Sequence, residues 1–223
     1  MAASPSYHED MTLRRWFPIL LAIAVLGVVF GMGALRRPLL RAAGQALAVD
    51  EPVEAADIVV LPEWAGRAGA IEAADLIRGG VADRVAVLPV AHGPAERELS
   101  RRGVAGHDGT TELTELLKAL GIVKVETIAN AAGGTEAEGQ VLPAWCDEHR
   151  FRSIVVVSTP DHSRRARRVL HRSMEGHHTK VSIRSTRFSS FDPASWWRTR
   201  DGARTEIVEL EKLLLDAIRH PIS

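Results

Sequence analysis

The chain is poor in cysteine, lysine and tyrosine, and neither sign of charge is in excess. Its 223 residues include one cysteine (Cys146), one tyrosine and four lysines, and the formal net charge is zero. A single cysteine excludes an internal disulfide, and the balanced charge gives no indication of a nucleic acid partner. The sequence also lacks the G-x-S-x-G, Walker A and G-x-G-x-x-G motifs. It therefore does not indicate an α/β-hydrolase, a P-loop site or a dinucleotide site, and no cofactor is predicted.

Charge is absent from one long stretch, residues 16–35, which reads WFPILLAIAVLGVVFGMGAL. As a helix at about 1.5 Å per residue, this stretch is about 30 Å long, which matches the hydrocarbon thickness of a bilayer. Arginines bracket it, and Trp16 lies where an interfacial aromatic is common. A cleaved signal peptide has a shorter apolar core, and a helix that is apolar on every face is unusual in a small soluble domain. We predict a single uncleaved anchor whose partner is the lipid bilayer.

The anchor divides the chain into four parts. These are an N-terminal tail at 1–15, the anchor at 16–35, a juxtamembrane connector at 36–54 and an α/β domain at 55–220. Arginines flank the anchor in similar number on both sides, so the positive-inside rule does not orient the domain.

Short apolar runs alternate with helical patterns beyond residue 55. We expect strands at 57–61, 84–88, 123–128, 154–157 and 181–183. We expect helices at 65–78, 110–120, 135–148, 160–174 and 203–218. Strands that alternate with helices of about 10–15 residues predict a Rossmann-like three-layer α/β/α fold, with a mostly parallel sheet of about five strands.

Residues 153–168, SIVVVSTPDHSRRARR, are the most informative segment. An apolar, β-branched run ends in polar residues, and Pro160 suits the first turn of the helix that follows. The carboxyl ends of parallel strands meet at one edge of the sheet, where open α/β folds bind ligands. We therefore expect His162 to lie in a site there, as a proton donor or acceptor. Arg165, three residues later, shares its helix face and suits a carboxylate or a phosphate.

These residues resemble the ElyC/SanA/YdcF family, a bacterial group with a Rossmann-like domain, and the resemblance covers residues 47–218. Ser158, His162, Arg165 and Ala166 are similar to the family's VTSxxHxxRA pattern, and Asp57 heads a strand similar to its ADAIVVLG. Arg67 stands where the family often has an arginine. Thr135 and Glu138 resemble the family's helix start with a threonine and an acid.

The resemblance implies a membrane-anchored envelope protein that binds a small polar or anionic ligand, with a role in cell-envelope or peptidoglycan homeostasis. It places the protein in the bacterial inner membrane with an extracytoplasmic domain. The site would use His162 for proton exchange and Glu138 to orient a partner group. Its ligand-binding residues would be Arg67, Thr135, Ser158, Arg165 and Asp57.

Two departures from the family favour a different function. The family's glycine-rich loops are replaced by Pro62-Glu63-Trp64 and by Leu88-Pro89-Val90, which removes the close backbone approach that holds phosphate-like groups. The alternative is therefore a degenerate, non-catalytic scaffold or sensor. A third hypothesis is a domain that faces the cytoplasm and binds a nucleoside-type cofactor.

Other features have two interpretations each. Arg164, Arg168 and Arg172 share a helix face, which suits either anionic lipid or solvent. Gly133-Gly134-Thr135 suits either an anion at a helix start or a capping box of Thr135 with Glu138. Asp57 either orients a site residue or pairs with a neighbouring arginine. His171, His177 and His178 lack the further ligands of a metal site, so none is predicted.

Overall fold

The computed structural model describes residues 33–104, 108–129 and 133–221, and the chain divides into two compact units, residues 1–42 and 43–223. Residues 33–47 are helical, so helix extends well into the predicted connector. The predicted anchor, residues 16–35, lies outside the described residues except for its last three. In the described part of the chain, no helix has both the length and the apolarity needed to cross a bilayer.

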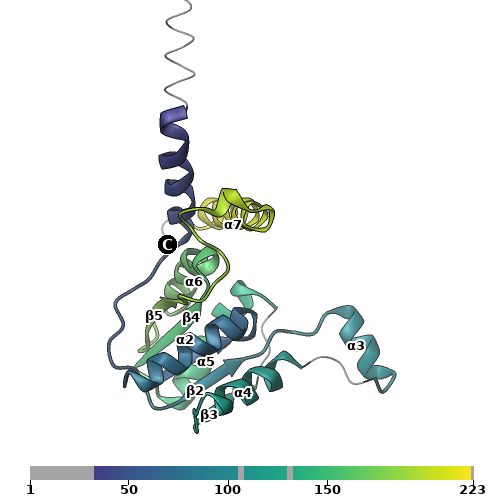
Figure 1. Ribbon diagram of the computed structural model, residues 1–223. Helices are drawn as coiled ribbons and strands as arrows, with labels where there is room; N and C mark the ends of the chain where they lie inside the picture. Colours follow the sequence, from purple (N-terminus) through teal and green to yellow (C-terminus); the bar gives the residue numbers. More distant parts are fainter. Residues whose placement is uncertain (1–32, 105–107, 130–132, 222–223) are drawn as a thin grey trace, which may run out of the picture. The chain divides into compact units, whose positions relative to one another are not determined.

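The second unit is built on a parallel sheet of five strands (Figure 1). The strands are β1 (Ile58–Pro62), β2 (Val85–Leu88), β3 (Val125–Thr127), β4 (Ser153–Ser158) and β5 (Lys180–Ser185). Their order across the sheet is β3-β2-β1-β4-β5, and Val60 of the central strand pairs with Ala86 on one side and Val156 on the other. The predicted Rossmann-like α/β class is confirmed, and every strand pair is parallel.

Helices cover both faces of the sheet and form the outer layers. The helices α2 (Gly66–Arg78) and α4 (Gly109–Ala119) pack on the face that Val59 and Leu61 present. The opposite face, which includes Ile58 and Val60, packs against α5 (Thr135–His149) and α6 (Pro160–Ser173). Alternate residues of β1 thus enter two separate cores, because successive side chains of a strand point to opposite faces. This explains why the central strands are apolar throughout.

The remaining elements surround this frame. They are two 3-10 turns, η1 (Glu63–Ala65) and η2 (Trp196–Arg198), and two helices, α3 (Pro94–Arg101) and α7 (Arg200–Arg219). The sequence did not predict α3, which has no buried residue. Without an apolar face, the segment gave no helical pattern to detect.

Ion pairs join α7 to α6. Asp216 accepts hydrogen bonds from Arg168 at 2.6 Å and from Arg172 at 3.1 Å, and Arg164 donates to the carbonyl of Ala48. The arginine row of α6 therefore faces neither lipid nor open solvent, and both interpretations of it were wrong. Its members bind the last helix and the segment that precedes the sheet.

The strand order creates a crevice at the carboxyl edge of the sheet. From β1 the chain passes to α2 on one face, and from the adjacent β4 it passes to α6 on the other. Loops that leave neighbouring strands in opposite directions leave a gap between them, and this switch point is where open α/β sheets bind ligands. Trp64 follows β1 and His162 follows β4, so both lie at that point.

Candidate functional site

His162 lies in the first turn of α6, directly beyond β4. The helix begins at Pro160, and the backbone N–H of His162 donates to the carbonyl of Thr159. Its side chain is 12% exposed. On one side of the ring, Nε2 lies 2.8 Å from the hydroxyl of Thr135, and on the other Nδ1 lies 3.3 Å from the Glu209 carboxylate. The imidazole thus connects a hydroxyl on α5 with a carboxylate on α7.

Arg165 completes this connection one turn along α6. Its guanidinium donates to the Thr135 hydroxyl at 2.6 Å and to Glu209 Oε2 at 3.1 Å. A third contact, of 2.8 Å, joins its Nη2 to Nδ1 of His162. Because Arg165 can only donate, this contact is a hydrogen bond only where Nδ1 accepts, and Nε2–H then donates to Thr135. With a proton on Nδ1, the ring donates to Glu209 instead, and its contact with Arg165 is no longer a hydrogen bond.

Trp64 closes the cluster from the β1 side. Its ring centroid lies 4.3 Å from that of His162, in an edge arrangement, and its indole N–H donates to Glu138. Glu138 is 2% exposed. Burial raises the pKa of its carboxyl, although the indole hydrogen bond and the charges of His162 and Arg165 act in the opposite direction. Glu138 is thus a buried acid with a tendency to hold its proton.

Glu209 is the anionic centre of the cluster. Burial alone would raise the pKa of this carboxyl, but hydrogen bonds from His162 and Lys212, with the charges of His162 and Arg165, lower it to about 2. Lys212 donates to its second oxygen at 2.7 Å. Glu209 is therefore ionised throughout the physiological range and holds three nitrogen-bearing side chains in place.

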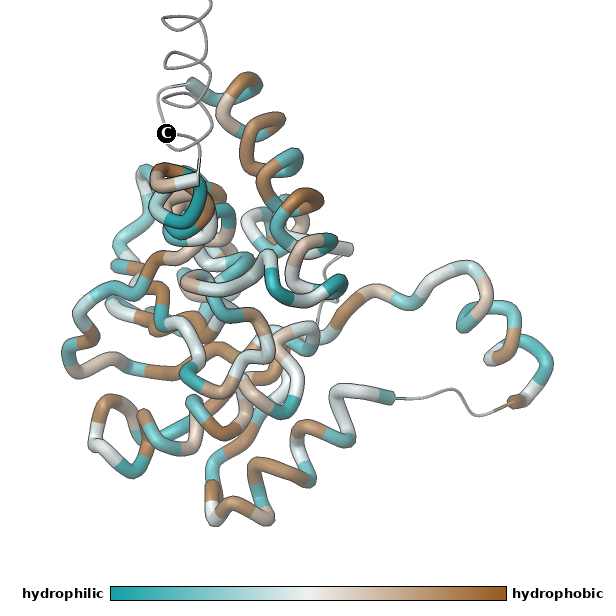
Figure 2. Tube along the Cα trace, turned by 45° about the horizontal axis from the view of Figure 1, so that its top comes forward, coloured by the Kyte–Doolittle hydropathy of each residue, from teal (hydrophilic) through white to brown (hydrophobic). Residues whose placement is uncertain are grey.

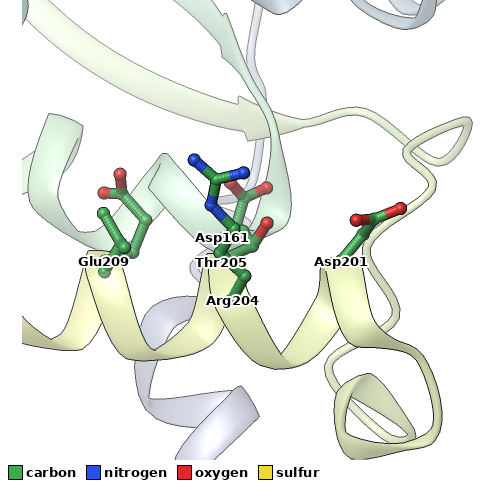
Figure 3. Close-up of a pocket in the computed structure, with 6 residues that line it drawn as sticks. Asp161, Asp201, Arg204, Thr205 and Glu209 are labelled. Carbon is green, nitrogen blue, oxygen red and sulfur yellow. The ribbon is translucent and has the colours of Figure 1, made fainter.

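A hollow of about 400 Å³ opens beside these residues. Its lining includes Trp64, His162, Arg165, Phe191, Glu209 and Lys212. A second hollow of about 380 Å³ adjoins it along α7 and shares Asp161, Thr205 and Glu209 with it. Figure 3 shows the second hollow, where Arg204 stands beside Asp161, while Asp201 and Glu209 lie at opposite ends. The first hollow presents Asp161 and Glu209 beside its cationic and aromatic groups, and the second adds Asp201 and Arg204.

The structure brings together four of the residues that the sequence singled out: His162, Arg165, Thr135 and Glu138. Ser158 lies nearby as the buried last residue of β4, and its hydroxyl donates to the carbonyl of Thr159. It therefore does not line the hollow.

Two predicted site residues lie elsewhere. Arg67 forms two hydrogen bonds with Glu112 on α4, at 2.7 and 2.9 Å, and its side chain is 78% exposed. Asp57 precedes β1 at the amino edge of the sheet, where it accepts from the backbone N–H groups of Arg152 and Ser153. Asp57 thus joins the starts of β1 and β4, and in the part of the chain that the structure describes it neither contacts a residue of the cluster nor forms an ion pair with an arginine. Neither residue lines the hollow, because a motif places a residue along the chain and does not say what its side chain reaches.

The helix start at Thr135 is not a capping box. The N-cap of α5 is Gly134, with φ of 114°, and no side chain caps the helix. The Thr135 hydroxyl instead contacts His162 and Arg165, while Glu138 accepts from Trp64. Both side chains of the expected capping box thus form hydrogen bonds with residues of other elements.

Glu63 and Trp64 lie in the loop that directly follows β1. Glu63 accepts from the backbone N–H of Val90, in the loop after β2, at 2.9 Å. It also accepts from the hydroxyl of Thr110 at the start of α4 at 3.0 Å. These bonds cross-link the carboxyl-edge loops, so side chains perform a task that a glycine-rich backbone cannot perform.

Sequence reasoning missed Trp64, Glu209 and Lys212 as members of the cluster. Trp64 had a detectable signal, because it directly follows the first strand on the edge where ligands bind. Glu209 and Lys212 had none, since they lie 44 or more residues beyond Arg165 on a helix whose packing the sequence does not specify.

Comparisons with known proteins give little further information. No family model matches the chain, and no curated protein matches it. Among solved structures, the chain is similar to a universal stress protein in complex with cAMP, with a TM-score of 0.35 and 15% sequence identity. That likeness covers 61% of this chain and 100% of the other. At this level of overlap, the likeness carries no information about a ligand here.

Proposed function

We propose that the protein is a membrane-anchored binding protein that holds a small polar or anionic ligand in the hollow between the ends of β1 and β4. The observation that carries the proposal is the convergence of Trp64, His162, Arg165 and Lys212 on one hollow of about 400 Å³ at the switch point of the sheet. The two cationic side chains suit a carboxylate or phosphate, and the rings of Trp64 and His162 offer an apolar wall.

The anchor at residues 16–35 and the resemblance to the ElyC/SanA/YdcF family support the setting we propose. In this setting the domain lies outside the cytoplasm, against the inner membrane of a bacterium, and contributes to cell-envelope or peptidoglycan homeostasis. The ligand is then a component of the envelope or one of its precursors.

The second candidate is a non-catalytic scaffold or sensor. One observation favours it: the charged groups of the cluster already satisfy one another, since Glu209 engages Arg165, His162 and Lys212 at once. A cluster closed in this way is a stable structural element without a ligand.

Thermal unfolding of the full-length protein in a mild detergent separates the two candidates. The probes are inorganic phosphate, glucose 6-phosphate, AMP and undecaprenyl phosphate. A ligand at about 100 times its dissociation constant stabilises the folded state by about 2.7 kcal/mol. We expect at least one probe to raise the melting temperature of the wild type and not that of the H162A/R165Q variant.

Arg67→Ala is the matched control, because it removes an exposed arginine outside the cluster. This variant should respond as the wild type does. If all three proteins are unaffected by every probe, the scaffold is the better account. Equal shifts in the wild type and in H162A/R165Q would place the ligand elsewhere.

A further inference from the structure

On the last helix, α7, acidic residues are buried and large apolar residues are exposed, which is the reverse of the usual arrangement. Its buried residues are Glu206, Glu209 and Asp216. Its exposed residues include five large apolar ones, between 38% and 67% exposed: Ile207, Val208, Leu214, Leu215 and Ile218. Figure 2 shows hydrophobic colour recurring along this helix. A helix on the surface of a soluble domain ordinarily buries its apolar face, so this face requires an explanation.

Helical geometry gathers these residues on one side. Leu214 and Ile218 lie seven and eleven residues beyond Ile207, close to two and three helical turns, so the three form one row. Val208 and Leu215 form a second row beside it. A contiguous exposed apolar surface of this kind marks an interaction site.

The charges among these rows favour an anionic surface. From Arg204 to Arg219, the exposed charged residues are Arg204, Glu211, Lys212 and Arg219. Lys212 donates to Glu209 and lines the hollow, so two cations and one acid remain for the apolar face. Long cationic side chains on an apolar helix face extend toward lipid phosphates while their stems cover apolar surface. A partner with an apolar interior and an anionic boundary fits this combination.

The chain itself brings such a surface near. Only residues 36–42 separate the predicted anchor from the second unit, and seven residues span at most about 25 Å when fully extended. Within that unit, the backbone at Gly44 packs against Pro193 and Trp196, leaving no room for a side chain. Trp196 belongs to η2, which packs on α7. Within the second unit, the point where the chain enters therefore lies beside η2, which contacts α7.

We propose that the outward face of α7 lies on the surface of a bilayer that contains anionic lipid. This inference rests on the proposed anchor at residues 16–35, which keeps the helix at the membrane. Apolar side chains on such a helix enter the boundary between headgroups and acyl chains. The acidic side of α7, which holds Arg165 through Glu209, then links the bilayer surface to the ligand hollow.

Site-directed spin labelling of the full chain in nanodiscs tests this proposal. The discs contain phosphatidylcholine and phosphatidylglycerol, and the nitroxide is placed at Leu214→Cys. The native Cys146 is fully buried and stays unlabelled. The measured quantity is the ratio of the label's collision rate with dissolved oxygen to its collision rate with a water-soluble nickel chelate. We expect this ratio to be several-fold higher than for a label in water.

Val123→Cys is the matched control, because Val123 is apolar and 90% exposed but precedes β3 at the amino edge of the sheet. Its label should behave as one in water. A label at residue 214 that matches this control overturns the proposal. Dipolar broadening between labels of two copies also overturns it, since the face would then pair with a second chain. Failure of the protein to remain in the discs would instead show that the anchor is wrong.

Discussion

Single side chains decide what the carboxyl edge of this sheet can do. Trp64 closes one wall of the hollow, and Glu63 joins the neighbouring loops through hydrogen bonds. Both act through fixed side-chain contacts. The edge therefore offers a ligand side-chain donors and a ring surface, in place of the backbone amides of a phosphate loop.

Among the residues of the cluster, Glu209 should lower the free energy of unfolding most when its charge is removed. Its pKa is lowered to about 2, so its carboxylate stabilises the fold above its ordinary pKa, and that contribution is lost as the pH falls through about 2. We expect Glu209→Gln to lower the free energy of unfolding at neutral pH by about 3 kcal/mol, because Arg165 loses its charged partner. Denaturant unfolding measures this loss, which should shrink as the pH is lowered toward about 2.

Glu211→Gln is the control on the same helix, since Glu211 is exposed. Its effect should stay within about 0.5 kcal/mol. A Glu209→Gln protein as stable as Glu211→Gln at neutral pH would show that the ion pairs at Glu209 contribute nothing net.

Glu206 should give the opposite pH dependence. It is fully buried, and neither carboxyl oxygen has a hydrogen-bond partner among the described residues. Burial and the nearby Asp161 raise its pKa to about 7. Because the folded state favours the protonated form, this stability is present below the ordinary pKa of the group and is lost as the pH rises through about 7. Glu206→Gln should therefore raise the melting temperature by about 4 °C at about pH 8 and leave it unchanged at about pH 4.5.

The variant Asp161→Asn tests whether the charge of Asp161 helps to raise the pKa of Glu206. Removal of its charge should lower the pKa of Glu206 and narrow the difference between the wild type and Glu206→Gln at mildly alkaline pH. If Glu206→Gln melts below the wild type at alkaline pH, the carboxylate has a partner that stabilises it.

At the scale of elements, the sequence predicted best where local pattern and packing agree. The expected strand at 154–157 corresponds to β4 (Ser153–Ser158), and the expected helix at 135–148 corresponds to α5 (Thr135–His149). Apolar runs and helical spacing were sufficient there, because both elements face the core. The exposed α3 was not predicted, because none of its residues is buried in the core.

The pairing of α6 with α7 was beyond the reach of the sequence. Its contacts join residues of opposite charge that are 44 to 48 positions apart, and an arginine row has the same pattern whether it meets solvent, lipid or acid. The same limit applies to the site: residues on β4 and α6 could be named in advance, whereas Glu209 could not.

Asp216 provides a test of that pairing. It is 6% exposed and holds Arg168 and Arg172. We expect Asp216→Asn to destabilise the protein by about 3 kcal/mol, the lower end of the range for breaking a buried pair. The matched control is Asp83→Asn, which breaks an exposed pair with Lys124 and should cost far less. Equal losses in chemical denaturation would mean that the helices are held together by other contacts.

At the scale of the whole molecule, strand order places the candidate site between β1 and β4. The order β3-β2-β1-β4-β5 makes β1 and β4 neighbours although about 90 residues separate them in sequence. Alternating strands and helices predicted a parallel sheet, and the general rule for such sheets predicted the edge. The position of the crevice between these two strands depends on the order, which the sequence pattern alone does not specify.

The most direct test of the account is the response of the Trp64 indole to a bound ligand. The full-length protein in detergent is titrated with inorganic phosphate and with glucose 6-phosphate, and the indole N–H resonances are followed by NMR, with Trp64→Phe to assign the signal. The account predicts that the Trp64 resonance shifts and saturates while that of Trp145, outside the hollow, stays fixed. A saturable shift at Trp145 with Trp64 unmoved would contradict a ligand site between β1 and β4.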